Sequence, residues 1–390
     1  MSLISAHIGQ QKIYSNKTII ADMPKNRYKV VLLPGDGIGK EVIREGKKIL
    51  EIVEERFNLN FEFIEIECGG EYYLKTGKEW EENSFEICKE SDAILLGAVG
   101  WPGANLPNGD LAGAGVVFGC RFGLDLYANV RPTKLYPNVA HKISNNFKNV
   151  WEPKNVDFVI VRENSEGLYT PIRGSLKRFG IEEVAIDVRV ITKKGAERVI
   201  NYAYQLAKKR RKKLTCVDKS NVLRGCQFFR ALFDEVGKKY QEVEKDYAYI
   251  DAFTQWMLRS PEWYDVVVTT NMFGDIITDL ASVLQGGMGM AAGANIGDVY
   301  GMFEPIHGSA PKHANQDKAN PTAMILATSM MLDWLGNKNI DEKLLSAGKA
   351  VEKAVENHMR DGKLLTYDLG GKAKCSEVGS AIANRIKSND

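Results

Sequence analysis

The chain has 390 residues, of which 44% are hydrophobic and 26% charged, and 52 basic and 50 acidic side chains leave a formal net charge of +2. These values exclude an intrinsically disordered chain, a collagen-like repeat and a small disulfide scaffold. The near-balanced charge argues against a nucleic-acid-binding protein, and no apolar stretch approaches the roughly 20 residues of a membrane span. A prior of roughly 150 residues per domain predicts two or three domains.

Strand-sized apolar runs alternate with helical stretches along the chain. The predicted strands, rich in Val and Ile, are residues 30–33, 61–66, 93–96, 158–161, 184–191, 214–217 and 266–270. The predicted helices are residues 40–56, 196–210, 275–285, 322–335 and 342–359. Continuous apolar strands suit a sheet buried on both faces, so this order predicts an α/β fold with a largely parallel sheet.

The first predicted strand leads into the segment PGDGIGK, residues 34–40. A dinucleotide fingerprint needs a small residue where Lys40 stands, so the segment predicts a tight strand-to-helix turn instead. A longer loop is expected over residues 97–115, and ordered loops of that length usually carry function. The basic run at residues 208–213 closes a predicted helix, which favours a solvated helix end over a nucleic-acid patch.

Six cysteines and five histidines are scattered without a C-x-x-C pair or a histidine cluster. We therefore expect free thiols in a reducing cytoplasm, and neither disulfides nor a zinc framework. Residues 1–27 lack the features of a signal or transit peptide, which also favours a cytoplasmic protein. Carboxylates must then hold any metal, and they favour a hard cation such as Mg²⁺ or Mn²⁺.

Basic side chains are placed where they could bind an anionic substrate. Arg121 and Arg131 lie in one segment, and Arg162 directly follows a predicted strand. Each guanidinium can grip one carboxylate of a polycarboxylate. The spacing does not distinguish this arrangement from ordinary surface ion pairs.

Acidic side chains suggest a metal site. Asp275 and Asp279 share one face of a predicted helix, and two like charges side by side favour a cation between them. A helix start favoured by its dipole is the alternative. Asp251 ends another predicted strand and is a candidate third ligand. Lys219 also follows a strand, where open α/β sheets place ligands, and is either a proton-transfer group or a solvated lysine.

The segment EPIHGSAPKHA, residues 304–314, precedes Asn320 and a long apolar helix. Its small residues would let the loop wrap a flat ligand, and its backbone amides could face phosphates. A generic surface loop is the alternative.

Together these segments resemble the β-decarboxylating dehydrogenases, the family of 3-isopropylmalate, isocitrate, homoisocitrate and tartrate/D-malate dehydrogenases. The match runs from about Arg27 to the C-terminus. It implies two α/β domains with a cleft between them and not a Rossmann fold. The large cofactor-binding domain would comprise residues 1–127 and 286–390, with 1–27 as an extension, and the small domain residues 128–285.

The resemblance also implies roles for single residues. Tyr169 would protonate the enolate that decarboxylation leaves, and Lys219 would assist removal of the substrate hydroxyl proton. The substrate carboxylates would be bound by Arg121, Arg131 and Arg162, and the Mg²⁺ or Mn²⁺ by Asp251, Asp275 and Asp279. In the family, the residues matching Lys219 and Asp251 come from the neighbouring subunit, which implies a homodimer with shared active sites, or a tetramer.

The nucleotide site implied by the resemblance comprises Gly97, Ala98, Val99, Gly100, Asn221, Glu304, His307, Gly308, Ser309, Ala310, Lys312, His313, Asn320 and Tyr367. NAD-dependent members usually carry an Asp at the position of Lys312. A cation there would pair with a 2′-phosphate, so Lys312, His313 and Tyr367 favour NADP over NAD. The arginine that accompanies the tyrosine in NADP-dependent members is replaced by Gly371.

The substrate is expected to be a malate-type 2-hydroxy acid that is oxidised and decarboxylated. Val117 and Phe118 would form an apolar wall, which leaves a third carboxylate unpaired and favours 3-isopropylmalate or a related alkylmalate. Gly115 stands where isocitrate enzymes place a serine. Residues 97–102 resemble the tartrate/D-malate branch, so isocitrate and tartrate/D-malate oxidation stay open. A non-catalytic regulatory subunit is the alternative from another class, although the catalytic and metal-binding residues are all present.

Overall fold

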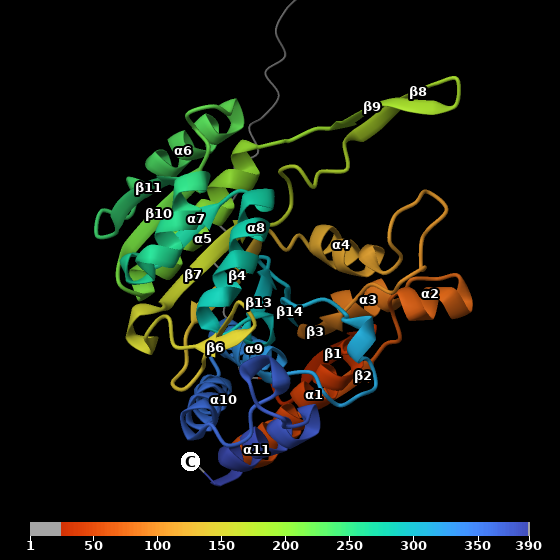
Figure 1. The fold of residues 1–390 in the computed structure, drawn as a ribbon, viewed down its shortest axis with the longest axis vertical. Helices are drawn as coiled ribbons and strands as arrows, with labels where there is room; N and C mark the ends of the chain where they lie inside the picture. The colour runs from red at the N-terminus through yellow and green to blue at the C-terminus, as the bar shows by residue number, and fades with distance from the viewer. Residues whose placement is uncertain (1–24, 389–390) are drawn as a thin grey trace, which may run out of the picture.

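The computed structural model describes residues 25–388, and most of its strands join one large sheet (Figure 1). The strand order in this ten-stranded sheet is β11-β10-β12-β7-β4-β13-β14-β3-β1-β2. Its strands are β1 (Tyr28–Gly35), β2 (Phe61–Glu65), β3 (Ala93–Ala98), β4 (Ala128–Lys134), β7 (Asp157–Glu163), β10 (Lys213–Asp218), β11 (Glu244–Tyr249), β12 (Val266–Thr269), β13 (Ala292–Ile296) and β14 (Gly301–Pro305). Two small hairpins pair β5 (His141–Ile143) with β6 (Asn146–Lys148) and β8 (Arg173–Arg178) with β9 (Ile181–Asp187).

The large sheet has two parallel halves joined by antiparallel strands. Strands β2, β1, β3 and β14 pair in parallel on one side, and β11, β10, β12 and β7 do so on the other. Between them, β4 and β13 pair antiparallel with each other and with their outer neighbours. The predicted α/β fold is confirmed. The sequence analysis missed β4 and β13 because polar and small residues interrupt their apolar character.

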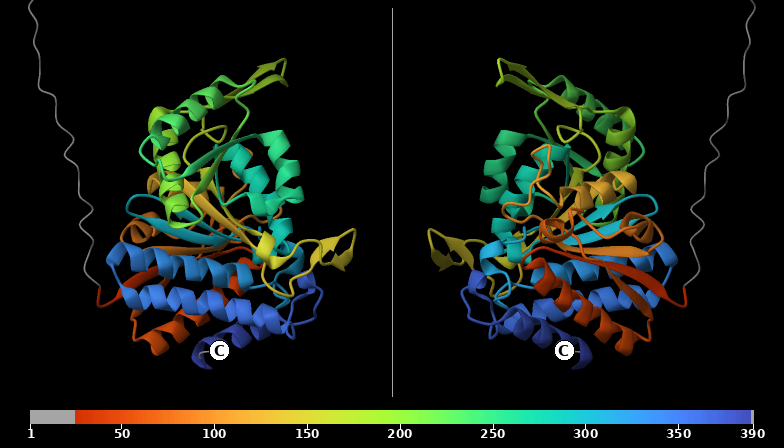
Figure 2. Two further views of the ribbon diagram at one scale, coloured as in Figure 1. Left: turned by 90° about the vertical axis from the view of Figure 1, so that its left-hand side faces the viewer. Right: turned by 90° about the vertical axis from the view of Figure 1, so that its right-hand side faces the viewer.

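Helices cover both faces of the sheet (Figures 1 and 2). The helices are α1 (Gly39–Phe57), α2 (Gly70–Thr76), α3 (Ser84–Lys89), α4 (Ala114–Gly123), α5 (Lys193–Lys209), α6 (Arg224–Gly237), α7 (Ile250–Arg259), α8 (Asn271–Ser282), α9 (Thr322–Asn339), α10 (Glu342–Asp361) and α11 (Cys375–Ser388). Helix α10 packs along α9, and α1 packs against both α9 and α11. The five predicted helices are therefore found, with α8 beginning four residues earlier than expected.

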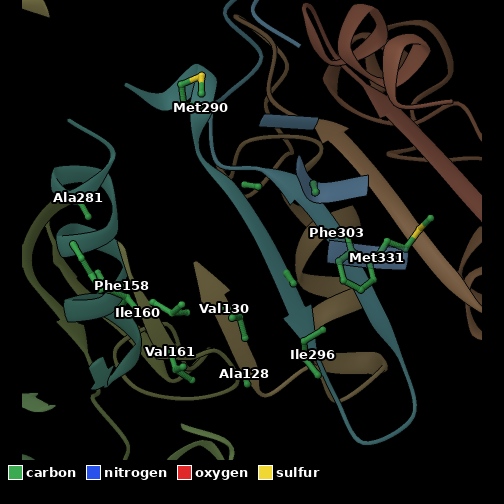
Figure 3. Packing of buried hydrophobic residues seen from close by; sticks show 14 of the residues in the cluster. Ala128, Val130, Phe158, Ile160, Val161, Ala281, Met290, Ile296, Phe303 and Met331 are labelled. Atoms are coloured by element: carbon green, nitrogen blue, oxygen red, sulfur yellow. The ribbon is translucent and has the colours of Figure 1, made fainter. Parts of the chain in front are cut away.

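One cluster of buried hydrophobic side chains runs through both halves of the sheet. Figure 3 shows its centre, where Val130 of β4 lies near Ile160 and Val161 of β7, with Ile296 of β13 on the other side. Residues 128–285 supply β4, β7, β10, β11 and β12, and the flanking segments supply the other five strands. The division into two domains is a proposal. The boundary between the proposed domains runs between β4 and β13.

The predicted buried strand at residues 184–191 is wrong. Strand β9 ends at Asp187 and pairs only with β8, in a hairpin that extends away from the body of the molecule (Figure 1). All residues of both strands are exposed, and Phe179 at the tip is 97% exposed. The apolar run was misread because hydrophobic residues look the same in a sequence whether this chain or another molecule covers them.

Several smaller predictions are confirmed. All six cysteines are buried and unpaired. The basic run ends α5 and begins β10 with Lys208, Lys209, Arg211 and Lys212 exposed, as a solvated helix end requires, while Lys208 pairs with Glu242 at 2.8 Å and Arg210 with Asp265 at 2.8 Å. Between residues 25 and 388, no helix combines the length and apolar character needed to cross a bilayer.

The strand-to-helix turn at residues 34–40 is also confirmed. Gly35 has a φ of 69°, and a Cβ atom there would lie 2.1 Å from the carbonyl oxygen of Ala98, so no larger residue fits. The side chain of Asp36 is fully buried and accepts hydrogen bonds from the amides of Gly70 and Gly100 at 2.8 and 2.7 Å. The turn therefore fixes the loop that follows β3.

Candidate active site

The antiparallel centre of the sheet carries a row of polar side chains on one face. Because side chains alternate along a strand, Asn129 and Arg131 of β4 point to the same face. The strand register pairs Asn129 with Arg162 of β7 and with Asn295 of β13. Asn129 donates to Asn295 at 2.8 Å and accepts from Nε of Arg131 at 2.7 Å. Register and alternation together thus place two of the predicted substrate arginines side by side.

Arg162 is buried and held by the first turns of α8. Its Nε and Nη2 atoms donate to Oδ1 of Asn271 at 3.0 and 2.8 Å, and Nη1 donates to Oδ1 of Asp275. A Cβ atom on Gly274 would lie 2.5 Å from Cγ of Arg162, so only glycine lets the helix approach this closely. Burial, followed by the charges of Arg131 and Arg121, lowers the pKa of Arg162 to about 9. An anion here would relieve this concentration of positive charge.

Arg121 completes the group from helix α4. Its Nη2 atom donates to Oε1 of Glu304 at 3.0 Å, while its buried Nε has no hydrogen-bond partner among the described residues. Arg131 donates to Thr278 at 2.6 Å and lies 3.8 and 3.7 Å from the carboxylates of Asp275 and Asp279. The three arginines converge and are not scattered surface ion pairs.

Tyr169 and the two aspartates of α8 lie against these arginines. The Tyr169 hydroxyl donates to Oδ2 of Asp275 at 2.7 Å, and the Arg162 guanidinium lies 5.5 Å from the tyrosine ring centre. Burial and the hydrogen bond to Asp275 raise the pKa of Tyr169. Burial opposes ionisation of Asp275, but the neighbouring arginines lower its pKa overall. Burial and the charge of Asp275 raise the pKa of Asp279.

Lys219 and Asp251 form a separate pair. Nζ of Lys219 lies 2.8 Å from Oδ1 of Asp251, at the carboxyl ends of β10 and β11. The hydrogen bond from Lys219 lowers the pKa of Asp251. The three predicted metal ligands do not converge within one chain, because among residues 25–388 the only ligand triplet within 4.8 Å involves other side chains. Asn221 lies exposed in the turn after Lys219.

The predicted nucleotide loop meets the loop after β3. Ser309 donates its hydroxyl hydrogen to the carbonyl oxygen of Gly100, and its own carbonyl accepts from the amide of Ile38 at 2.9 Å. His307 contacts the Gly308 carbonyl through Nδ1 at 3.0 Å, while its buried Nε2 has no partner in the described part of the chain. Burial lowers the pKa of His307. The loop at residues 307–310 therefore contacts the loop after β3 through Ser309 and Gly100.

Aromatic and cationic side chains gather at the far end of this loop. The ring centres of His313 and Tyr367 lie 5.4 Å apart, and Nζ of Lys318 lies 4.5 Å above the Tyr367 ring. Lys312 is exposed in the same turn, Pro311–His313. Asn320 donates to Asp368 at 3.0 Å. Lys318 was not identified from the sequence, where it is one lysine in a polar loop.

Comparison with known proteins identifies the chain. The family model for isocitrate/isopropylmalate dehydrogenases matches residues 29–382. The chain belongs to this family. It is 44% identical to a 3-isopropylmalate dehydrogenase of Bifidobacterium longum over 327 residues, which are 83% of this chain and 92% of the relative. It is 39% identical to a 3-isopropylmalate/3-methylmalate dehydrogenase of Methanocaldococcus jannaschii, covering 92% of this chain and 99% of the relative.

Solved structures agree with this family membership. An isocitrate dehydrogenase from Methylococcus capsulatus is 34% identical with a TM-score of 0.81, covering 92% of this chain and 99% of that one. A β-decarboxylating dehydrogenase from Thermococcus kodakarensis, in its apo form, is 37% identical with a TM-score of 0.73, covering 93% and 96%. The family resemblance and the fold predicted from it are confirmed, and the chain is a decarboxylating dehydrogenase, an oxidoreductase acting on CH–OH groups.

The residues of this family member fit a hard divalent cation and a nucleotide. The carboxylate of Asp279 accepts no hydrogen bond in the described structure, so its oxygens are available as ligands beside Asp275. The orphaned Nε2 of His307 and the open space beside Gly308 leave room and a polar contact for a flat ligand. The sequence analysis missed Asn129, Asn271 and Asn295, which orient the arginines. Asn129 and Asn295 lie within strands, and Asn271 begins α8 shortly after β12. These positions were the only indication of their role in the sequence.

Proposed function

We propose that the chain oxidises and decarboxylates 3-isopropylmalate or a related alkylmalate, using NADP and Mg²⁺ or Mn²⁺. The observation that carries this proposal is the convergence of Arg121, Arg131 and Arg162 on the face of the sheet where Tyr169 and Asp275 also lie. Two carboxylates of a malate-type substrate match these guanidinium groups.

The arginines would bind and orient the substrate. Arg121 has an unpartnered buried Nε, and Arg162 is fixed by Asn271, so each offers a donor in a defined direction. Burial strengthens their attraction for an anion because water screens the charges poorly there. Substrate binding would replace part of the contact between Arg131 and the α8 carboxylates.

Asp275 and Asp279 would hold the metal ion together with Asp251 of a second subunit. Within the described chain Asp251 pairs with Lys219 and does not form a ligand triplet with Asp275 and Asp279, so we propose that a second copy completes the site. A bound Mg²⁺ would polarise the substrate hydroxyl and carboxylate oxygens, as Lewis acids do, and the nicotinamide would accept the hydride. Lys219 of the second copy would assist removal of the hydroxyl proton.

Tyr169 would deliver the proton that replaces the departing CO₂. Its raised pKa keeps the phenol protonated, which a general acid requires. Asp275 accepts the phenol hydrogen at 2.7 Å and so holds the hydroxyl against the substrate face. The proton would pass from the phenol oxygen to the substrate carbon that has lost its carboxylate.

Two features of α4 favour an alkylmalate over isocitrate. Val117 stands one turn before Arg121 and packs against apolar side chains, and the Phe118 and Phe122 rings stack with centres 5.7 Å apart. Glu79 accepts hydrogen bonds from the amides of Gly113 and Gly115 at 2.7 and 2.9 Å. These amides are thus unavailable to a third substrate carboxylate, which Glu79 would also repel.

The turn that carries Lys312 favours NADP. Lys312 and Lys318 bring two cations to the loop, and His313 and Tyr367 provide rings beside them. A 2′-phosphate would gain charge-assisted contacts there, whereas NAD would leave them unused. Lys312→Asp should therefore lower kcat/KM for NADP at least tenfold while sparing NAD.

Two observations support the proposed homodimer, the incomplete metal site and the β8–β9 hairpin. Leu176, Phe179, Ile181 and Ile186 are each more than half exposed there, a density of apolar side chains that monomers rarely display. A second copy would cover them. The buried free thiols suit a reducing compartment such as the cytoplasm.

A substrate panel tests the proposal. The expected order of kcat/KM is 3-isopropylmalate first, then D-malate, with isocitrate, homoisocitrate and tartrate at least tenfold lower, in each case with Mg²⁺ and either nucleotide. Glu79→Gln should improve isocitrate oxidation relative to 3-isopropylmalate, and Glu86→Gln, an exposed glutamate on α3, is the control. Isocitrate as the best substrate of the unaltered enzyme would refute the substrate assignment, and absence of activity with all five would refute the function.

A further inference from the structure

Three potential metal ligands outside the proposed active site converge between helices α1 and α11. They are Glu41 on α1, Asp317 in the loop before α9, and Cys375 at the start of α11. One ligand atom of each lies within 4.8 Å of the other two, and no other such triplet occurs among residues 25–388. The cluster differs in composition from the proposed catalytic site, which offers oxygen ligands only.

Glu41 lacks the partners that a buried carboxylate needs. Its side chain is 6% exposed, and neither carboxylate oxygen has a hydrogen-bond partner within the described residues. One turn later on α1, the fully buried Glu45 accepts hydrogen bonds from Arg44 and Lys48. Burying a charge without a partner is costly. Glu45 has two cationic partners, whereas Glu41 has none among the residues described and can accept a cation.

Asp317 is held in a fixed position over the start of α11. Its backbone carbonyl accepts from the amide of Cys375 at 2.8 Å, and its side chain accepts from the amide and hydroxyl of Ser376 at 3.0 and 2.5 Å. Arg44 also donates to it at 3.2 Å. Oδ1 thus accepts two hydrogen bonds and Oδ2 accepts one, which leaves Oδ2 a lone pair for a further ligand contact.

The thiol of Cys375 is fully buried and makes no disulfide. Burial, followed by the charges of Glu45, Asp317 and Glu41, raises its pKa. Metal binding to a cysteine releases the thiol proton.

We propose that Glu41, Asp317 and Cys375 bind a divalent transition-metal ion, with Zn²⁺ the best match. Thiolate ligands favour Zn²⁺ over the hard cations Mg²⁺ and Ca²⁺, and Zn²⁺ binds both cysteine thiolates and carboxylate oxygens. Ligand distances of about 2.0–2.3 Å require ligand atoms roughly 3.5 Å apart, which small side-chain rotations would reach from the observed spacing. A fourth position remains for water.

The ion would join three segments that are distant in the sequence. Helices α1 and α11 already pack together, and Asp317 belongs to the loop that leads from β14 to α9. Because the ligands are assembled only in the folded chain, the ion would stabilise the fold by mass action. This site goes beyond the proposed function and does not depend on it.

Cobalt titration of the full chain tests the site. After removal of metals with a chelator, Co²⁺ bound to a thiolate produces a charge-transfer absorption in the near ultraviolet that an all-oxygen site lacks. We expect one equivalent of this absorption in the unaltered protein and in the Asp275→Asn/Asp279→Asn variant. The absorption should vanish in Cys375→Ser. It should remain in Cys226→Ser, because Cys226 is equally buried but lies outside the cluster. Glu41→Gln should weaken Co²⁺ binding at least tenfold.

Two results would overturn the proposal: no thiolate absorption in the unaltered protein, or an absorption that persists in Cys375→Ser. Circular dichroism establishes whether Cys375→Ser is folded. If Cys375→Ser does not fold, the Co²⁺ affinities of Glu41→Gln and Asp317→Asn test the site instead. Unchanged affinity in both variants would refute it. Zn²⁺ should also raise the Tm of the unaltered protein and raise that of Glu41→Gln less.

Discussion

The hydroxyl of Tyr169 donates to one carboxylate oxygen of Asp275 at 2.7 Å, while Arg162 donates to the other. A single carboxylate thus connects the proposed general acid to a proposed substrate-binding guanidinium. The helix that carries Asp275 can lie this close because Gly274 has no side chain to keep it from Arg162. Proton delivery and substrate orientation are therefore coupled through one residue, which is itself a proposed metal ligand.

Tyr169→Phe should slow turnover strongly while leaving binding intact. The variant removes the proton donor and keeps the ring that lies near Arg162. Loss of a general acid costs roughly 10²–10⁴-fold in rate, so we expect kcat to fall at least tens-fold, with KM and Mn²⁺ affinity within about threefold of the original. Steady-state kinetics and Mn²⁺ titration measure these quantities.

Tyr247→Phe is the matched control, because Tyr247 also donates to an aspartate, Asp234, but on the exposed side of β11. Its kcat should be unchanged. Near-original turnover in Tyr169→Phe would rule out the assignment of this residue as the general acid.

Gly274→Ala should weaken both substrate binding and the fold. The new methyl group would lie 2.5 Å from Cγ of Arg162, whose buried side chain must then move. We expect KM for the substrate to rise at least tenfold and the free energy of unfolding to fall by about 1–3 kcal/mol, as overpacking does. Gly119→Ala is the control, since its methyl group would meet Trp80 at an ordinary 3.5 Å. Equal KM values in the two variants would contradict the tight packing of α8 on Arg162.

The sequence predicts six of the ten strands of the large sheet but not the antiparallel strands at its centre. Strands β1, β3, β7, β10 and β12 are continuous apolar runs buried on both faces, and such runs are recognisable without a structure. Strand β4 reads ANVRPTK because one of its faces carries Asn129 and Arg131. A strand that forms a site loses the apolar pattern by which strands are found.

The convergence of the three arginines also needed the structure. The spacing of the arginines in the sequence fits surface ion pairs equally well. Their convergence depends on the strand register, which places Arg162 opposite Asn129. Their positions at strand ends made Lys219 and Asp251 candidates, but only the family resemblance implied that a neighbouring subunit supplies them. Neither residue contacts the arginines within one chain, so no local pattern could have shown that they belong to the same site.

Charged residues at the tip of the β8–β9 hairpin should break the proposed homodimer. Phe179→Asp combined with Ile181→Lys replaces two apolar side chains that are 97% and 70% exposed with charged ones, at the surface that is proposed to contact the second copy. Desolvating these charges would cost more than association provides, so we expect monomers in analytical ultracentrifugation and loss of most activity. Leu74→Lys, at a 55% exposed leucine on α2, should leave the mass and activity unchanged. A double variant that stays dimeric would place the interface elsewhere.

Asp333→Asn should stabilise the protein at neutral pH and not in acid. Burial and the charge of Glu352 raise the pKa of Asp333 from 3.8 to about 6. The folded chain therefore holds this proton more tightly than the unfolded chain does, and its stability falls as the pH rises from about 4 to 6. Asparagine cannot ionise and avoids this loss. Because the carboxyl is partly solvated, we expect a gain of about 1–2 kcal/mol at pH 7.5 and none near pH 4. Urea denaturation at several pH values measures the difference. A gain that is the same at every pH would show that folding does not raise the pKa of Asp333.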